Sequence, residues 1–200
     1  MKLVLATHNK DKITEIKALL QELPIEIYTF SDFDNFPDVV EDRDTLEGNA
    51  EKKVREIYEI TSMPALADDT GLFVDAMNGE PGVFSSRYAG ENVTYADNRE
   101  KLLKEMIDIP EGKRDAVFKT VIVLIVNTNG KYVVEGRCEG YIGFKEKGNM
   151  GFGYDSIFYL HDSGKSFAEL TLEEKNKISH RGRALQKIKK VLEEIVRKHK

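Results

Sequence analysis

Two adjacent carboxylates, Asp68 and Asp69, are the residues whose type and placement are best suited to chemistry. They follow the apolar stretch 64–67, which reads as a short strand, and they precede Thr70 and Gly71. Two neighbouring acids cannot both point into one apolar core. At a strand end they suit Mg²⁺, a hard ion that prefers carboxylate and phosphate oxygens, and Gly71 lets a ligand approach closely. A solvent-exposed Asp-Asp turn is the alternative interpretation.

An acidic block upstream offers a further carboxylate. Residues 32–51 hold eight acids against a single base, Arg43. Within that block, Glu41 is a candidate to complete a set of metal ligands with Asp68 and Asp69. Taken alone, Glu41 is better explained as one solvated acid among many.

The turn after the first apolar stretch is a candidate anion site. Residues 2–7 read as a buried strand, and Asn9 is placed to cap the helix that follows. Backbone N–H groups and the positive end of the helix dipole meet at such a turn, and they bind anions. Thr7 and Asn9 add hydrogen bonds, while Lys10 and Lys12 add positive charge. Neither common nucleotide-binding fingerprint is present, so an ordinary capped helix start is an equal alternative.

A glycine-rich loop and a polar tripeptide complete the candidates. In Gly151–Asp155 two glycines surround Phe152, which is typical of a platform on which a flat base stacks. Asp155 can hydrogen-bond a base edge or fix the loop, and a hairpin bend with buried aromatics is the alternative. Further along, a serine is followed by His180 and Arg181, which can recognise phosphate or carbonyl oxygens. Such a tripeptide also occurs at ordinary helix starts.

The elements that must position these residues alternate early in the chain and cluster later. Apolar periodicity and capping patterns predict four helical regions, which begin after Asn9, at Thr45, at the capping-box pattern Asp97–Glu100 and at the capping-box pattern Thr171–Glu174. The predicted strands cover 2–7, 25–30, 64–67, 72–76, 116–126, 132–135, 138–144 and 156–160, with turns at 78–79 and 81–82. This order favours an α/β protein with a mixed sheet.

Composition narrows the class of protein. Apolar residues make up 40% and charged residues 32% of the 200 residues, which is typical of a globular chain. The longest apolar run, Val121–Val126, is far too short to span a membrane, and no signal peptide precedes the first strand, so we expect a cytoplasmic protein. Cys138 is the single cysteine, which excludes an internal disulfide and a cysteine-based zinc site. The net charge of −5 argues against a surface that coats nucleic acid.

Five short motifs in order carry a resemblance to a known family. They are Ala6-Thr-His-Asn-x-x-Lys12, Ala67-Asp-Asp-Thr-Gly71, Pro81-Gly-Val-Phe-Ser-Ser-Arg87, Gly151-Phe-Gly-Tyr-Asp155 and Ile178-Ser-His-Arg181. With them the chain resembles the inosine triphosphate pyrophosphatase family from Lys2 to the last helix. The resemblance implies a single domain over residues 1–200. It implies an elongated α/β fold, with a mixed parallel and antiparallel twisted sheet flanked by helices, two lobes around a central substrate cleft, and a homodimer.

The resemblance also implies a reaction and its residues. The expected reaction is hydrolysis of the deaminated purine nucleotides ITP, dITP and XTP to the monophosphate and pyrophosphate, with Mg²⁺ as cofactor. The expected partner is this small molecule, with no nucleic acid and no membrane. The implied phosphate ligands are Thr7, His8, Asn9, Lys10, Asp11, Lys12 and Lys53. The implied metal ligands are Glu41, Asp68 and Asp69; Asp69 is also the implied base that activates water, and Thr70 the implied contact to substrate. The implied base pocket comprises Phe152, Gly153, Tyr154, Asp155, Lys175, His180 and Arg181.

Two departures from the family pattern affect the upstream metal ligand. The family usually has an acid just before the asparagine of the second helix, whereas here Gly48 precedes Asn49 and Glu47 lies one place earlier. Glu41 is followed by Asp42, where a glycine is common in the family. Glu47 is therefore the alternative to Glu41 as a metal ligand.

Two other functions remain to be weighed. The last twenty residues hold eight bases against two acids, which suits a nucleotide- or RNA-binding module without catalysis as well as the solvated face of an amphipathic helix. A binding module, however, has no use for the Asp68–Asp69 pair beside an anion site. A pyrophosphatase that prefers modified pyrimidines is the second alternative.

Deaminated purines carry a 6-oxo acceptor where adenine has an amino donor, so donors in the base pocket would discriminate strongly between them.

Overall fold

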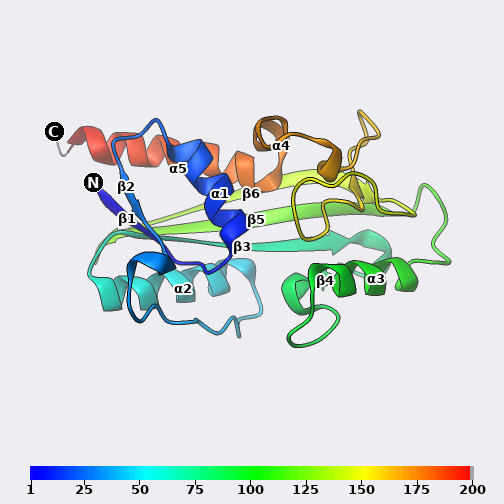
Figure 1. The fold of residues 1–200 in the computed structure, drawn as a ribbon, viewed down its shortest axis with the longest axis horizontal. Coiled ribbons are helices and arrows are strands. Elements are labelled where there is room, and N and C mark those ends of the chain that lie inside the picture. The colour runs from blue at the N-terminus through cyan, green and yellow to red at the C-terminus, as the bar shows by residue number, and fades with distance from the viewer. Residues whose placement is uncertain (199–200) are drawn as a thin grey trace. The chain divides into compact units, whose positions relative to one another are not determined.

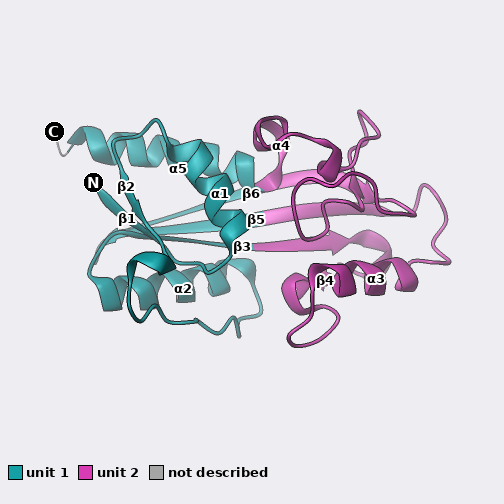
Figure 2. Cartoon of the chain, in the orientation of Figure 1, with its two compact units in different colours: residues 1–69, 120–136, 181–200 teal, residues 70–119, 137–180 magenta. Residues whose placement is uncertain are grey.

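The structure is a computed structural model that describes residues 1–198, and these form two compact units (Figure 2). Unit 1 comprises residues 1–69, 120–136 and the described chain from 181 onward, and unit 2 comprises residues 70–119 and 137–180. Lys200, one of the bases of the C-terminal tail, lies outside the described residues. Three strands run through both units: β3 (Ala65–Val74), β5 (Asp115–Asn127) and β6 (Gly130–Ile142).

Unit 1 is a sheet with helices on both faces. Its strand order is β2-β1-β3-β5-β6, in which β1 (Lys2–Leu5) pairs in parallel with β2 (Glu26–Tyr28) and with β3. Helices α1 (Lys10–Leu20) and α5 (His180–Lys198) lie on one face, and α2 (Leu46–Thr61) lies on the other (Figure 1). The side chains of β3 alternate between these two faces because successive residues of a strand point in opposite directions.

The apolar core of unit 1 follows from two periodicities. Leu3 and Leu5 of β1 and Leu66 of β3 point to the face that α1 and α5 cover, and these helices add residues at helical spacing, among them Ile13, Ile16, Leu20, Leu185, Ile188 and Leu192. All of these side chains are buried. Each such burial stabilises the fold by roughly 1.5–3 kcal/mol. The core therefore holds α1 and α5 firmly against the strand that carries the two acids.

Unit 2 continues the same strands with an antiparallel addition on each side. Its order is β4-β3-β5-β6-β7, with β4 (Pro81–Gly82) and β7 (Phe158–Tyr159) antiparallel to their neighbours. The other elements are α3 (Tyr95–Glu105), α4 (Leu172–Ile178) and the 3₁₀ helices, of which η2 (Asp75–Met77), η3 (Ser85–Arg87) and η4 (Phe167–Glu169) lie in unit 2 and η1 (Phe30–Asp32) lies in unit 1. The core of unit 2 is rich in aromatic side chains.

The mixed α/β fold predicted from the sequence is confirmed, and so are the helix starts at Asn9, Thr45 and Thr171. Asn9 accepts hydrogen bonds from two backbone N–H groups of α1, and Thr45 accepts one from α2. Thr171 and Glu174 form the expected capping box. Cys138 is buried. The arrangement of two lobes around a cleft, the elongated shape and the single domain stay predictions.

Several predicted boundaries were wrong. Stretches 64–67 and 72–76 are parts of one strand, β3, so Asp68 and Asp69 lie in the middle of a strand and not at its end. Stretches 132–135 and 138–144 are likewise joined in β6. Asp68 and Asp69 interrupt the run of apolar residues in β3, but the strand continues through them because each acid is buried with charged or polar partners.

The start of α3 and two short strands also differ from the prediction. Helix α3 begins at Tyr95, and its capping box is formed by Thr94 and Asp97, not by Asp97 and Glu100. Residues 81–82 pair with β3 as the two-residue strand β4, where a turn was predicted. The strand predicted at 156–160 is only two residues long. Within the described residues no helix is both long and apolar enough to cross a membrane.

Candidate active site

Asp68 and Asp69 occupy opposite faces of β3, and this alternation lets two adjacent acids both be buried. Asp68 is 1% exposed and Asp69 5% exposed. Oδ2 of Asp68 lies 3.2 Å from Nζ of Lys12 and 3.1 Å from Nε of Arg181, which belong to α1 and α5. Oδ2 of Asp69 instead accepts a 3.0 Å hydrogen bond from Nδ2 of Asn49, on α2. Each acid therefore has its own set of partners on its own side of the sheet.

The turn between β1 and α1 delivers Lys12 to Asp68. Asn9 Oδ1 accepts hydrogen bonds from the N–H groups of Asp11 and Lys12, at 3.0 and 3.1 Å, and Thr7 Oγ1 accepts one from the N–H of Asn9. This cap fixes the first turn of α1, so the Lys12 side chain points toward the strand. Burial lowers the pKa of Lys12, while the Asp68 charge opposes that shift.

The other predicted members of this turn lie at the surface. His8, Lys10 and Asp11 are exposed. The His8 ring packs 5.2 Å from Phe30, and its Nδ1 lies 3.8 Å from a carboxylate oxygen of Asp38. These three side chains are therefore placed on the solvent side of the capped helix start, whereas Lys12 belongs to the buried cluster.

Arg181 lies between two buried acids. Its Nη1 donates a 2.6 Å hydrogen bond to Oε2 of Glu15, and its Nε donates one to Asp68. Burial alone would lower the pKa of Arg181, but Asp68 and Glu15 outweigh it and raise the pKa above its usual value. Burial likewise tends to raise the pKa of Asp68, and the charges of Lys12 and Arg181 hold it well below the usual range instead. These residues keep Asp68 ionised.

On the opposite face, Lys53 joins Glu41 to Asp69. Nζ of Lys53 donates hydrogen bonds to Oε1 of Glu41 and, at 2.7 Å, to the backbone oxygen of Asp68, and it lies 3.8 Å from Oδ1 of Asp69. Burial lowers the pKa of Lys53, but the three acids outweigh it and raise the pKa. Burial raises the pKa of Asp69, and Lys53 only partly offsets this. Glu47 is exposed on the first turn of α2.

A divalent cation at this cluster would meet two carboxylates. Within residues 1–198, no group of three or more histidine, cysteine, aspartate or glutamate side chains is arranged to hold a metal ion. Glu41 and Asp69, however, approach the same ammonium from different segments, so their oxygens can face one cation. Mg²⁺ is usually bound through one or two carboxylates together with substrate phosphates. The pair fits such an ion, and the geometry favours Glu41 over Glu47 as the partner of Asp69.

In unit 2 the loop 151–155 is folded around one carboxylate. Oδ2 of Asp155 accepts a 2.8 Å hydrogen bond from the N–H of Phe152 and a 2.6 Å hydrogen bond from Nζ of Lys175, on α4. Gly151 has φ = +72°, and a Cβ added there would lie 2.1 Å from the same Asp155 oxygen. Only glycine fits at this position. Nζ of Lys175 also lies 5.0 Å from the centre of the Phe152 ring.

His180 belongs to an aromatic stack in unit 2. Its ring lies 4.4 Å from Phe118 with an angle of 12° between the planes, and 6.1 Å from Phe167. His180 is buried, and Nζ of Lys175 lies 5.8 Å from the same Phe167 ring. The structure therefore brings four predicted base-pocket residues, Phe152, Asp155, Lys175 and His180, together in unit 2.

Comparison with known proteins decides the family. The sequence profile of the Ham1 family matches residues 3–191. The chain belongs to the Ham1 family. A dITP/XTP pyrophosphatase of a Thermoanaerobacter species is 50% identical over 189 residues, which cover 94% of this chain and 95% of the relative. A dITP/XTP pyrophosphatase of Geobacter sulfurreducens is 46% identical over 188 residues and 94% of each chain.

Solved Ham1 structures share the fold. A HAM1 protein from Coxiella burnetii superimposes with a TM-score of 0.88 at 42% identity, covering 97% of this chain and 99% of that one. The Ham1 protein of Staphylococcus aureus has a TM-score of 0.85 at 36% identity, with 96% and 98% covered. The mixed sheet and its flanking helices are thus those of the Ham1 family.

Two functional candidates in this Ham1-family chain were missed by sequence reasoning. No role was assigned to Glu15 from the sequence, and Asn49 was named only as the asparagine that follows Gly48. Both are buried and hold a member of the acid–base cluster, Arg181 and Asp69 respectively. The available signal was spacing: Glu15 lies three residues after Lys12 and Asn49 four residues before Lys53, so each shares a helix face with a predicted ligand.

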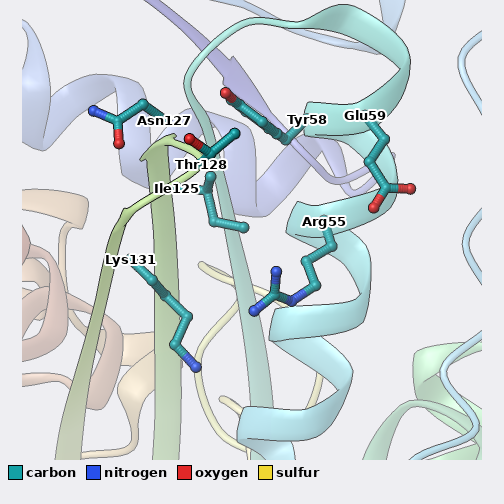
Figure 3. A pocket seen from close by; sticks show the side chains of 7 residues that line it. All are labelled: Arg55, Tyr58, Glu59, Ile125, Asn127, Thr128 and Lys131. Atoms are coloured by element: carbon teal, nitrogen blue, oxygen red, sulfur yellow. The ribbon is translucent and has the colours of Figure 1, made fainter.

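A hollow on the surface of unit 1 contains none of the predicted residues. It has a volume of about 230 Å³, and Figure 3 shows that its side chains come from the C-terminal half of α2, from β5 and the turn after it, and from β6: Arg55, Tyr58, Glu59, Ile125, Asn127, Thr128 and Lys131. Arg55 and Lys131 both pair with Glu51. This ion triad gives the hollow a structural explanation, because it ties α2 to the β5–β6 hairpin.

Proposed function

We propose that this chain is an Mg²⁺-dependent pyrophosphatase that hydrolyses ITP, dITP and XTP to the nucleoside monophosphate and pyrophosphate. The observation that carries the proposal is the buried cluster around the middle of β3. There, Asp69 faces Lys53 and Glu41, while Lys12 and Arg181 hold Asp68 on the other face. The printed name of the curated relatives, dITP/XTP pyrophosphatase, supports this activity and this class of substrate.

The residues of unit 1 bind the triphosphate. Lys12 and Lys53 neutralise its negative charge, and the capped N-terminus of α1 offers backbone N–H groups to a phosphate. Thr7 and Asn9 shape that turn, while His8, Lys10 and Asp11 border it on the solvent side. Lys53 contacts both Glu41 and the backbone of Asp68 before substrate binds, so its ammonium is already oriented.

Asp69 is the general base of the proposal. Its carboxylate takes a proton from the water that attacks the α-phosphorus, and pyrophosphate leaves. Burial raises the pKa of Asp69, which makes it a stronger base than an exposed aspartate, and Asn49 holds the carboxylate in place. Glu41 and Asp69 would hold Mg²⁺, which supplies charge neutralisation and orientation to the phosphates when bound. We also propose that Asp68 is a metal ligand and that Thr70 contacts the substrate.

The residues of unit 2 bind the base. Phe152 offers its ring for stacking, and Gly153, Tyr154 and Asp155 form the rest of the loop. Lys175 and His180 are donors of the kind that a 6-oxo group requires. A pocket that donates to that oxygen would face the amino group of adenine with the wrong partner, which costs far more than a poor fit does. The resemblance implies that Arg181 also contacts the base, and we include this role in the proposal. In the structure Arg181 contacts Glu15 and Asp68.

A substrate screen tests the proposal directly. The purified chain is incubated with Mg²⁺ and each of ITP, dITP, XTP, GTP, ATP, the common pyrimidine triphosphates and their modified forms, and pyrophosphate and orthophosphate are measured separately. We expect pyrophosphate from ITP, dITP and XTP, with kcat/KM at least about 100-fold higher than for ATP. Release of orthophosphate from ITP would refute the proposal. Faster turnover of modified pyrimidines would favour the alternative pyrophosphatase.

Two further proposals concern the oligomeric state of the chain and its location in the cell. We propose that the chain forms a homodimer, which sedimentation equilibrium of the purified protein tests. We also propose that it acts in the cytoplasm, where the nucleotide pool that it would clean is found. Cell fractionation with an antibody against the chain checks the second proposal.

A further inference from the structure

Helix α3 carries two side chains that hold the loop 151–155 from outside. Tyr95 and Arg99 are four residues apart, so they lie on the same face of the helix. The Tyr95 and Phe152 rings lie 5.8 Å apart, centre to centre, at an angle of 42°. Nη1 of Arg99 donates a 2.9 Å hydrogen bond to the backbone oxygen of Gly153. One helix face therefore contacts both the ring that stacks and the peptide next to it.

Arg99 also forms an ion pair with a carboxylate. Its Nε lies 2.9 Å from Oε2 of Glu146, and that carboxylate also accepts a 2.8 Å hydrogen bond from Oγ of Ser156. The side chain of Arg99 is 17% exposed. The guanidinium of Arg99 therefore makes a hydrogen bond through Nη1 and an ion pair through Nε, and its planar shape is pre-organised for such contacts in a way that a lysine ammonium is not. Arg99 thus links the Gly153 carbonyl to a carboxylate that Ser156 also contacts.

Helix α3 is itself anchored to the segment that holds Tyr154. Oδ1 of Asn98 accepts a 2.7 Å hydrogen bond from the N–H of Ala89, and its Nδ2 donates one to the backbone oxygen of Ser86. The hydroxyl of Tyr154 donates a 2.9 Å hydrogen bond to the backbone oxygen of Ser85. The helix and the loop therefore share one anchor, so a shift of α3 relative to the loop would break contacts on both sides.

We propose that Tyr95 and Arg99 are positioning residues that set the nucleobase specificity of this chain. This inference rests on the proposed function, in which the loop 151–155 binds the base. Discrimination between a 6-oxo and a 6-amino group requires donors that stay in place. A mobile peptide could offer its N–H to a 6-oxo group or its carbonyl to a 6-amino group, and would then accept both bases. Arg99 fixes the Gly153 peptide, and Tyr95 fixes the plane of the Phe152 ring.

The variant Arg99→Met tests this with Lys104→Met as its matched control. The first substitution keeps the stem of the side chain and removes the guanidinium, and the second removes an exposed cation from the same helix. For Arg99→Met we expect KM for ITP to rise about tenfold and the ITP-to-ATP ratio of kcat/KM to fall about tenfold, since small displacements in a site are costly. The inhibition constant of tripolyphosphate, which has no base, should not change. Lys104→Met should leave all three quantities unchanged.

A second pair of variants keeps the inference testable if Arg99→Met does not fold. Tyr95 is 40% exposed, so Tyr95→Ala does not threaten the core. We expect Tyr95→Ala to raise KM for ITP and lower the ITP-to-ATP ratio, and Tyr95→Phe, which keeps the ring, to restore both. Unchanged values for Tyr95→Ala in an otherwise active enzyme would overturn the inference and leave the function standing. An equal loss of tripolyphosphate affinity would also overturn it. Wild-type protein that releases no pyrophosphate from any purine triphosphate would overturn the function as well.

Discussion

Asp68 and Asp69 are neighbours in the chain, yet their carboxylates contact different side chains. The two-residue repeat of β3 directs Asp68 toward α1 and α5, and Asp69 toward α2. One acid has a lowered pKa and the other a raised pKa, because Asp68 has two buried cations as partners while the burial of Asp69 is only partly offset. Paired acids whose environments push their pKa values apart are typical of sites in which one group transfers a proton.

The first prediction concerns Asp69. Asp69→Asn should lower kcat for ITP by about 10²–10⁴-fold, because the amide cannot take the proton of the attacking water. The free energy of unfolding should stay close to that of the wild type, since the amide keeps the hydrogen bond from Asn49. Initial rates of pyrophosphate release and urea unfolding measure the two effects. Asp75→Asn, which changes an exposed acid, is the control. An unchanged rate for Asp69→Asn would remove Asp69 from the mechanism.

The second prediction concerns Glu15, which supports the cluster from α1. Glu15→Gln should lower the free energy of unfolding by about 1–3 kcal/mol, because Arg181 stays buried while one of its charged partners becomes neutral. Glu22→Gln, which breaks the exposed pair between Glu22 and Lys189, should have a much smaller effect. Urea unfolding of the two variants side by side decides the matter. Equal losses would mean that the Glu15–Arg181 pair contributes no more than a surface pair does.

At the scale of elements, three of the four predicted helix starts were correct, whereas the lengths of several strands were not. Asn9, Thr45 and Thr171 cap their helices through local hydrogen bonds, which depend only on residues a few places away. Strand β3 looked like two strands because Asp68 and Asp69 interrupt its hydropathy. Their partners, Arg181 above all, are distant in sequence, so no local pattern shows that the acids are buried. The motifs therefore identified the two acids, but only the packing of α1, α2 and α5 shows that the acids contact different partners.

The third prediction concerns the attachment of α2 to the β5–β6 hairpin. The Lys131 and Arg55 hydrogen bonds lower the pKa of Glu51. A carboxyl with a lower pKa in the folded state stabilises the fold above its unfolded pKa of about 4.3, and this contribution is lost as the pH falls through the folded value. Glu51→Gln should thus lower the free energy of unfolding by about 0.5–1 kcal/mol at pH 7, a small effect because the pair is partly exposed.

The pH dependence distinguishes a charge effect from a packing effect at Glu51. Urea unfolding of the wild type and Glu51→Gln is measured from neutral pH down to about pH 3, below the unfolded pKa of glutamate. We expect the difference between the two proteins to shrink steadily over that range and also with added salt, which screens exposed charges. A difference that stays constant with pH would show that the loss comes from packing, against the prediction.

For the whole molecule, the distribution of charge matters more than the net charge of −5. Three bases of α5 have partners within the chain. Arg181 is buried against Asp68 and Glu15, Lys189 pairs with Glu22 at 2.6 Å, and Lys187 donates a 2.6 Å hydrogen bond to the backbone of β6. Charges used in this way fix α5 to unit 1 and are not available to neutralise a polyanion. The acidic block at 32–51 adds repulsion toward any long nucleic acid.

The fourth prediction follows from this distribution and separates an enzyme for small nucleotides from an RNA-binding module. The chain should not bind a fluorescent single-stranded RNA of about 20 nucleotides at an ionic strength of about 0.15 M, whereas ITP should protect it against thermal unfolding in the presence of Mg²⁺. Fluorescence anisotropy measures the first and a melting curve the second. A nucleic-acid binder neutralises many phosphates at once, so its affinity falls steeply as salt is added. Tight RNA binding with such a salt dependence would contradict the prediction and favour the RNA-binding module.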